Sequence, residues 1–186
     1  MRRLAIVFGV VLVAGVCPAR AAVSESSPAP LLQDQALQGD FNGDGVADWA
    51  IGAPGEDVRT VRDAGAVNVL YQVFPGVASQ VFTQNSRSVQ SVAEPGDRFG
   101  GAVAVGNFNG DGFGDLVVGV PFESVGAAER AGAVNVLYGS PQGVPGYGNQ
   151  YLHQDRFGVG SSAESDDQFG AALATGDFNG DGTFSM

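Results

Sequence analysis

Short apolar runs separated by turn-forming residues recur along most of the chain. Ala102–Gly106, Leu116–Val120 and Ala133–Tyr138 are rich in alanine, valine or aromatic residues and are bounded by Gly, Asn, Asp or Pro. Such runs are typical of β-strands. Gln150–Gln154 is a weaker candidate strand, and Gln80–Gln84 occupies the matching place earlier in the chain. No stretch after the N-terminal region repeats apolar residues at helical spacing, so the pattern predicts an all-β protein.

The chain is internally repeated. Asp40–Gln72 aligns without a gap with Asn107–Gly139, and within this pair Ala64–Tyr71 recurs identically as Ala131–Tyr138. Four candidate strands per repeat, joined by Gly, Asn and Asp turns, predict one small antiparallel sheet for each repeat. Repeats of about 60–70 residues with four strands are typical of β-propeller blades. A β-sandwich is the alternative all-β fold, but it does not require identical repeats.

A second alignment extends the repeats towards the C-terminus. Ser91–Gly100 aligns with Ser161–Gly170, and the difference in length falls in the Gly- and Pro-rich segment after Tyr138. The expected fold is therefore a partial β-propeller of about two to three four-stranded antiparallel blades, with hairpin loops between the strands. The expected boundaries are a first repeat over 40–96 that lacks its start, a second over 97–166, and a truncated third over 167–186.

Each repeat contains a turn that is crowded with side-chain oxygens. In the first of them, Asp40–Asp48, oxygen-bearing residues stand at alternate positions and Gly45 permits a sharp turn. Oxygens on alternate positions converge when the backbone curls, as in the first part of an EF-hand loop. With no Cys or His among the ligands, the donors favour Ca²⁺ over Zn²⁺ or copper, and Mg²⁺ is disfavoured by its strict octahedral geometry.

The candidate ligands follow from this spacing. They are the side chains of Asp40, Asn42, Asp44 and Asp48 with the carbonyl of Val46; Asn107, Asn109, Asp111 and Asp115 with the carbonyl of Phe113; and Asp177, Asn179 and Asp181 with the carbonyl of Thr183. The second loop has one carboxylate fewer, so we expect it to bind calcium more weakly. The third has Ser at the last position, so we expect it to stay empty. The alternative is an Asx-rich hairpin turn that binds nothing.

Three sequence elements together resemble a known family. Phe99-Gly100, the loop 107–115 and Gly119-Val-Pro121 resemble the FG-GAP repeat of integrin α-subunit propellers and their bacterial relatives. Gly52-Ala-Pro54 matches the second element of the name literally, and Phe169-Gly170 begins the last repeat. The first repeat lacks a Phe-Gly pair before its loop. The resemblance implies propeller blades, calcium hairpins flanked by strands, and protein binding by loops on one face.

The residues that name the motif have structural interpretations. We expect Phe99 and Phe169 to pack between blades or against a neighbouring strand, and the glycine after each to allow a close backbone approach. Trp49 stands where Leu116 stands in the next repeat, so we expect it to lie in the core.

The N-terminal segment has the pattern of a secretory signal peptide over residues 1–21. Arg2 and Arg3 precede an apolar run, and Ala19-Arg-Ala21 is a small-x-small cleavage pattern. Residues 22–39 are predicted to be a disordered linker. Cys17 leaves lipid anchoring open, although the residue before it is a bulky Val. These features predict a secreted, extracellular or cell-surface protein that does not insert into a membrane once the signal is cleaved.

Charge and chemistry narrow the function. The net charge is −11 and lysine is absent, which argues against nucleic acid as a partner. His153 is the only histidine, and the chain after residue 21 has no Cys, so no acid–His–nucleophile arrangement can be built. A catalytic carboxylate pair stays open, but the best acidic clusters are assigned to calcium. We therefore expect a non-enzymatic, calcium-binding module for protein interaction or adhesion. Its partner would be an extracellular protein or surface ligand.

Two alternatives stay open. Secreted phospholipases with similar repeats keep their catalytic residues in another domain, so the chain could be the accessory propeller of a secreted hydrolase whose catalytic domain is absent. It could also be a non-functional gene fragment, since closed propellers have about four to eight blades.

Overall fold

The computed structural model describes residues 37–73, 76–87, 89–144, 148–156, 158–178, 180 and 184–186. The predicted signal peptide, Cys17 and most of the predicted linker lie outside the described residues.

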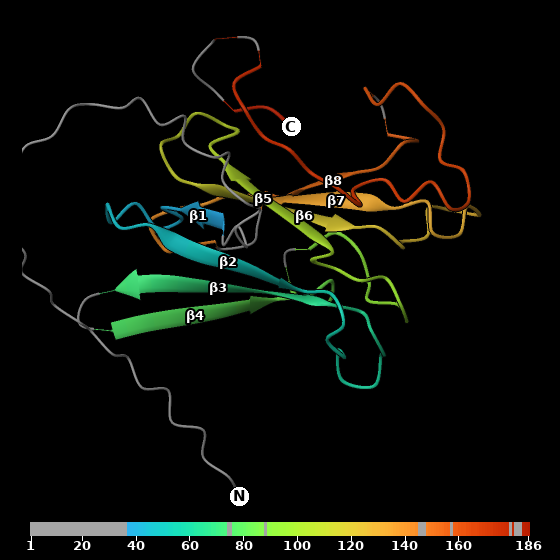
Figure 1. Cartoon of the computed structure of the whole chain (residues 1–186), viewed down its shortest axis with the longest axis horizontal. Coiled ribbons are helices and arrows are strands. Elements are labelled where there is room, and N and C mark those ends of the chain that lie inside the picture. The colour runs from blue at the N-terminus through green and yellow to red at the C-terminus, as the bar shows by residue number, and fades with distance from the viewer. Residues whose placement is uncertain are drawn as a thin grey trace, which may run out of the picture. The chain divides into compact units, whose positions relative to one another are not determined.

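Two antiparallel four-stranded sheets follow one another along the chain (Figure 1). The first contains β1 (Leu37–Gly39), β2 (Asp48–Ala53), β3 (Ala66–Val73) and β4 (Gly76–Phe82). The second contains β5 (Ala102–Gly106), β6 (Asp115–Val120), β7 (Ala133–Leu137) and β8 (Gln150–Leu152). Each strand pairs with the next in sequence, as in a propeller blade. The all-β prediction and the partial propeller of four-stranded blades are confirmed.

The two sheets share one register. Gly39 pairs with Asp48 in the first sheet, and the equivalent Gly106 pairs with Asp115 in the second. The next pairing, Trp49 with Leu70, likewise recurs as Leu116 with Leu137. Because a shift of one residue would turn every side chain to the opposite face, identical register places equivalent residues on equivalent faces.

Several predicted boundaries need correction. The linker was predicted to reach Gly39, but Leu37–Gly39 forms β1, so the first sheet has its first strand despite the missing Phe-Gly pair. The strand predicted at Gln80–Gln84 lies earlier, because β4 pairs with β3 from Gly76 to Phe82. The weak strand at Gln150–Gln154 ends at Leu152.

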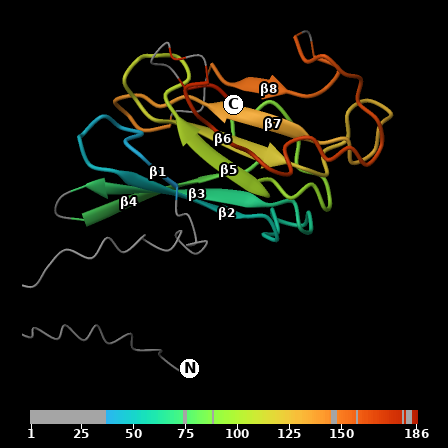
Figure 2. The same cartoon turned by 45° about the horizontal axis from the view of Figure 1, so that its top comes forward.

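The main core lies between the two sheets, which appear as successive layers in Figure 2. The first sheet contributes Ala50, Val67 and Val69 to the main buried cluster, which also includes Leu116, Val118, Val120 and Leu137 of the second sheet. Side chains along a strand alternate between the two faces of its sheet, and these residues lie on the faces that the two sheets turn towards each other. Burial of this shared face joins the two repeats into one folded unit.

The Phe-Gly pair joins the sheets, as predicted. Phe99 is fully buried in the main core, and its amide donates to the carbonyl of Ala64 at 2.8 Å. The amide of Gly100 donates to the carbonyl of Gly119 at 3.0 Å, and a Cβ added at Gly52 would clash with the carbonyl oxygen of Gly100. The Phe-Gly pair therefore makes a close backbone contact between successive sheets.

The prediction for Trp49 is only partly correct. Leu116 is fully buried between the sheets, whereas Trp49 is only partly buried. Ile51, two residues further along the strand, is 45% exposed. Both therefore lie on the face of the first sheet that points away from the second sheet.

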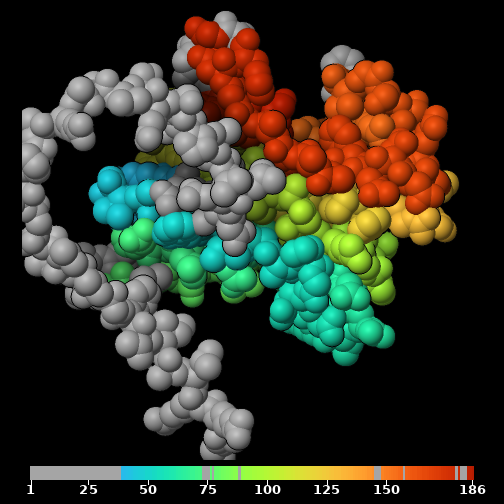
Figure 3. Space-filling model, in the orientation of Figure 1, coloured from blue at the N-terminus to red at the C-terminus, as the bar shows by residue number. Residues whose placement is uncertain are grey.

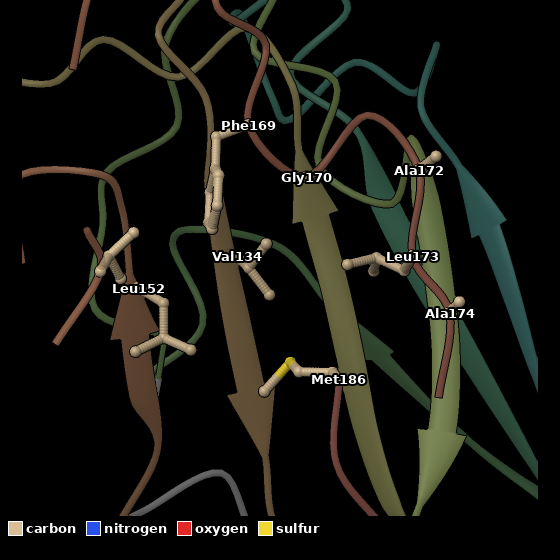
Figure 4. A pocket seen from close by; sticks show the side chains of 9 residues that line it. Val134, Leu152, Phe169, Gly170, Ala172, Leu173, Ala174 and Met186 are labelled. Atoms are coloured by element: carbon tan, nitrogen blue, oxygen red, sulfur yellow. The ribbon is translucent and has the colours of Figure 1, made fainter. Parts of the chain in front are cut away.

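The outer face of the second sheet carries the start of the third repeat. Phe169 and Leu173 pack against a second apolar cluster that contains Val117, Val134 and Val136. A cavity of about 390 Å³ remains there, with Val134, Leu152 and Phe169 around one side and Met186 at one end (Figure 4). In the space-filling view the residues after β8, coloured orange to red, lie beside the second sheet (Figure 3). No helix in the described part of the chain is long and apolar enough to span a membrane.

Candidate functional site: the oxygen-rich loops

The first two candidate loops close the first hairpin of each sheet. The loop Asp40–Asp48 joins β1 to β2, and the loop Asn107–Asp115 joins β5 to β6. Gly43 and Gly45 have φ angles of 73° and 83°. This left-handed conformation costs little only for glycine, so these positions allow the chain to curl around its own polar side chains.

Asp40 organises the start of the first loop. Its Oδ1 accepts from the amides of Gly43 at 2.7 Å and Asp44 at 3.1 Å, and its Oδ2 accepts from the amide of Gly45 at 2.9 Å. One carboxylate thus collects three backbone donors, which draws the loop into a tight curl around position 40.

Asn42 and Asp44 continue the same pattern towards the solvent. The amide of Asp44 donates to Asn42 Oδ1 at 3.0 Å, and the amide of Val46 donates to Asp44 Oδ1 at 2.8 Å. Asn42 Nδ2 donates to Asp44 Oδ2 at 3.1 Å. These i to i+2 bonds are Asx turns, in which a short polar side chain holds its own backbone. The side chain of Val46 is 45% exposed.

Asp48 anchors the loop to the sheet. It is fully buried, its Oδ2 accepts from the amide of Phe41 at 3.0 Å, and its Oδ1 accepts from the amide of Gln72 at 3.0 Å. Burial raises the pKa of Asp48, and the negative charges of Asp44 and Asp40 raise it further, while the two N–H donors lower it. The charges of Asp40 and Asp44 thus act on Asp48 in the direction that disfavours its ionised form.

The second loop repeats this geometry. Asn107 Oδ1 accepts from the amide of Gly110 at 2.9 Å, and the amides of Asp111 and Phe113 donate to Asn109 Oδ1 at 3.0 Å and Asp111 Oδ1 at 2.9 Å. Asp115 is fully buried and accepts from the amides of Phe108 at 2.7 Å and Gly139 at 2.9 Å. Burial also raises the pKa of Asp115, and the charge of Asp111 adds to the shift.

The loops also contact one another, which the sequence did not predict. The amide of Gly114 in the second loop donates to the carbonyl of Asp40 in the first at 2.8 Å. The equivalent bond links the third loop to the second, since the amide of Phe184 donates to the carbonyl of Asn107 at 3.2 Å. The ring of Phe113 lies against Gly43. The candidate loops therefore form a hydrogen-bonded series along one edge of the repeats, and no local sequence signal marks this contact.

Only part of the third loop can be compared. Asp177 Oδ1 accepts from the amide of Gly180 at 2.7 Å, as the first residue of each other loop does. Gly176 bridges Ser185, at the positions where Gly106 pairs with Asp115. Asn179, Asp181 and Thr183 lie outside the described residues.

The loops supply calcium-compatible donors in a hydrogen-bonded arrangement. Among the described residues, no three Asp, Glu, His or Cys side chains are grouped so that they could hold a metal ion. In the first two loops the carboxylate oxygens accept backbone or side-chain amide N–H bonds. Carboxylate, amide and carbonyl oxygens are the donors that hard cations such as Ca²⁺ prefer.

His153 is the one histidine of the sequence. The ring of His153 lies 5.3 Å from that of Tyr151, and its buried Nδ1 has no hydrogen-bond partner among the residues described. No hydrogen bond or ion pair found in the described part of the chain joins His153 to a carboxylate.

Comparison with known proteins identifies relatives of the repeats. The FG-GAP repeat family matches residues 35–70 and 99–137. The chain is 38% identical to mouse phosphatidylinositol-glycan-specific phospholipase D over 104 residues, which is 56% of this chain and 12% of that protein. It is 33% identical to integrin alpha-PS2 of Drosophila melanogaster over 142 residues, which is 74% of this chain and 10% of the integrin.

A second integrin alpha chain matches at a similar level of identity. The chain is 32% identical to integrin alpha-4 of Xenopus laevis over 122 residues, which is 65% of this chain and 11% of that protein. The chain thus spans between 10% and 12% of the length of these three relatives.

Proposed function

This chain carries FG-GAP repeats, and from that premise we propose that it is a calcium-binding segment of a secreted or cell-surface β-propeller that serves protein interaction or adhesion. The observation that carries the calcium assignment is the repetition of one loop geometry. Two loops in equivalent hairpins present oxygens at the same alternate positions and bury the last carboxylate in the same way.

The proposed ligands are those of the two described loops. In the first they are Asp40, Asn42, Asp44 and Asp48 with the carbonyl of Val46, and in the second they are Asn107, Asn109, Asp111 and Asp115 with the carbonyl of Phe113. Asp177, Asn179, Asp181 and the carbonyl of Thr183 stand at the equivalent positions of the third loop, but we propose that this loop stays empty because its last position is Ser185.

The proposed ion stabilises the hairpins. Its positive charge would offset the repulsion that acts on Asp48 from Asp44 and Asp40. Extracellular calcium modules bind with dissociation constants of about 0.1–1 mM, so ~1 mM calcium adds about 0.4–1.4 kcal/mol for each filled site. Because the loops are hydrogen-bonded to one another through Gly114 and Asp40, each filled loop would also support its neighbour.

We propose that the partner is an extracellular protein or surface ligand and that the chain itself is not an enzyme. The similarity to integrin alpha chains favours adhesion. The second candidate is the accessory propeller of a secreted hydrolase, which is favoured by the 38% identity to a phospholipase D. The two candidates share the same fold and the same loops.

Thermal unfolding with and without calcium tests the calcium assignment. We expect 1 mM calcium to raise the Tm of the full chain and a chelator to reverse the change. Asp44→Ala should blunt this response, because it removes an exposed loop carboxylate. Glu129→Gln is the matched control, since Glu129 is an exposed acid outside the loops. Equal melting of the wild-type chain in calcium and in chelator would refute the assignment.

A further inference from the structure

A buried polar cluster links the two repeats at a place that the loops do not reach. Gln84, Asp97 and Glu123 are 1%, 2% and 8% exposed. Gln84 follows the last strand of the first sheet, Asp97 precedes the Phe-Gly pair, and Glu123 follows β6 of the second sheet. Acidic side chains are rarely buried unless they are paired with a positive charge.

Glu123 is the centre of this cluster. Its Oε2 accepts from Gln84 Nε2 at 2.5 Å, and its Oε1 accepts from the hydroxyl of Tyr151 at 3.1 Å. The bond from Gln84 is a direct side-chain link between the segment that follows the first sheet and the second sheet. Asp97 is held at the same junction, because its Oδ2 accepts from the amide of Glu94 at 2.7 Å and its carbonyl accepts from the amide of Phe122 at 3.3 Å.

The charges around Glu123 are of one sign. Asp97 and Glu94 are the charged groups that act on it, and both are acidic. Arg98 is adjacent to Asp97 in sequence, but its guanidinium lies over the ring of Phe122, 5.0 Å from the ring centre. The one salt bridge found in the described part of the chain joins Arg130 to Asp166. With no cation paired to it, the cluster is neutralised most simply by a proton.

The repeats supply internal comparisons for this cluster. Gln154 and Asp167 align with Gln84 and Asp97 one repeat earlier, and Asp167 Oδ2 accepts from the amide of Glu164 at 2.9 Å. Asp167 is nevertheless exposed, and so is Glu56, the equivalent of Glu123. The local hydrogen bond is therefore common to both repeats, whereas burial of two acids together occurs where one sheet packs on the next.

We propose that protonation of the two acids buried at this junction, Asp97 and Glu123, acts as a pH-sensitive latch between the two repeats. With a proton present, the latch is closed and the Gln84 and Tyr151 contacts hold the junction together. When both carboxyls are ionised, their repulsion in a buried site weakens the contact between the sheets. The unfolding equilibrium of the chain then responds to pH in the range between mildly acidic and neutral.

The direction in which stability changes with pH follows from the pKa shifts of Glu123 and Asp97. Burial raises the pKa of Glu123 from 4.5 to about 7, and the charge of Asp97 contributes in the same direction. Burial raises the pKa of Asp97 from 3.8 to about 6. Both folded-state pKa values exceed the unfolded ones. The protonated acids therefore stabilise the folded chain fully at low pH, and this contribution to the free energy of unfolding is lost as the pH rises to about 7. For Glu123 alone, these values increase the unfolding constant about 70-fold between pH 5 and pH 8.

Urea unfolding of the full chain at fixed free calcium tests the latch. Relative to Glu123→Gln, which mimics the protonated acid, the wild-type unfolding constant should rise by about 70-fold between pH 5 and pH 8. Glu56→Gln is the matched control and should follow the wild type. If wild type and Glu123→Gln show the same pH dependence, the latch does not exist.

Carbon-detected NMR titration of the carboxyl groups is a second test of the latch. Its main measurement is made on the wild-type chain, so it does not require Glu123→Gln to fold. In the wild-type chain, Glu123 should titrate near neutral pH. Asp97→Asn should lower the pKa of Glu123 by removing the neighbouring charge, whereas Asp167→Asn should leave it unchanged. Titration of Glu123 at its ordinary value, or an unchanged pKa in Asp97→Asn, would overturn the proposal.

Discussion

Substitution of Gly52 by alanine tests how the two sheets are locked together. A Cβ at this position would clash with the carbonyl oxygen of Gly100 and would lie 3.3 Å from its carbonyl carbon. Those atoms cannot move aside easily, because the amide of Gly100 is hydrogen-bonded to the carbonyl of Gly119 and the amide of Phe99 to the carbonyl of Ala64. Relief requires a shift of one sheet relative to the other.

The expected cost follows from this geometry. Overpacking of a well-packed interior costs about 1–3 kcal/mol and sometimes more, and we expect Gly52→Ala at the upper end because only backbone atoms are in the way. Gly55→Ala is the matched control in the turn that follows the same strand. Its added Cβ would have Asp63 Oδ1 as its nearest neighbour at 3.9 Å, so we expect a change within about 1 kcal/mol.

Urea denaturation of both variants at one calcium concentration provides the measurement. An unchanged slope with a lower midpoint for Gly52→Ala would report a true loss of stability. If Gly52→Ala and Gly55→Ala unfold at the same urea concentration, the close approach of Gly52 to Gly100 does not hold the sheets together, and the reasoning fails.

Three further predictions concern the core and the loops. Phe99→Ala should lower the free energy of unfolding by about 3–5 kcal/mol, because its ring is fully buried. Phe178→Ala, at a ring that is 69% exposed, should change it by less than about 0.5 kcal/mol in the same urea assay. Tyr71→Phe should cost about 1–3 kcal/mol in thermal unfolding, since the amide of Val144 loses its acceptor; no change would mean that water replaces the hydroxyl. Without calcium, the contribution of Asp48 to stability should fall as the pH rises through its raised folded pKa. The gain in Tm on adding calcium should therefore be larger at pH 7.5 than at pH 5, and an equal gain at both would contradict a role for ionised Asp48.

The fold was predictable from the sequence because its signals are local and repeated. Valine-rich runs such as Leu116–Val120 mark buried strands, and the identical octapeptides fix equivalent strands in both repeats. The strand β1 was missed because Leu37–Gly39 is short and lacks a Phe-Gly pair before it. Its place depends on pairing with β2, which is a contact across a turn and not a property of the three residues themselves.

The candidate loops were predictable for the same reason, and their surroundings were not. The spacing of Asp40, Asn42 and Asp44 is a local pattern, and their side chains do organise one turn. Burial of Asp97 and Glu123 depends on two segments that meet only when the sheets pack. The exposed equivalents Asp167 and Glu56 have closely similar local sequences, so sequence alone cannot separate the two environments.

Lanthanide luminescence offers the most direct test of calcium binding, because the chain has a single tryptophan and it directly follows Asp48. Terbium bound in the first loop should emit when Trp49 is excited, calcium should displace it in a saturable manner, and Asp44→Ala should weaken the signal. Absence of sensitised emission, or emission that excess calcium does not remove, would contradict the assignment of this loop as a calcium site.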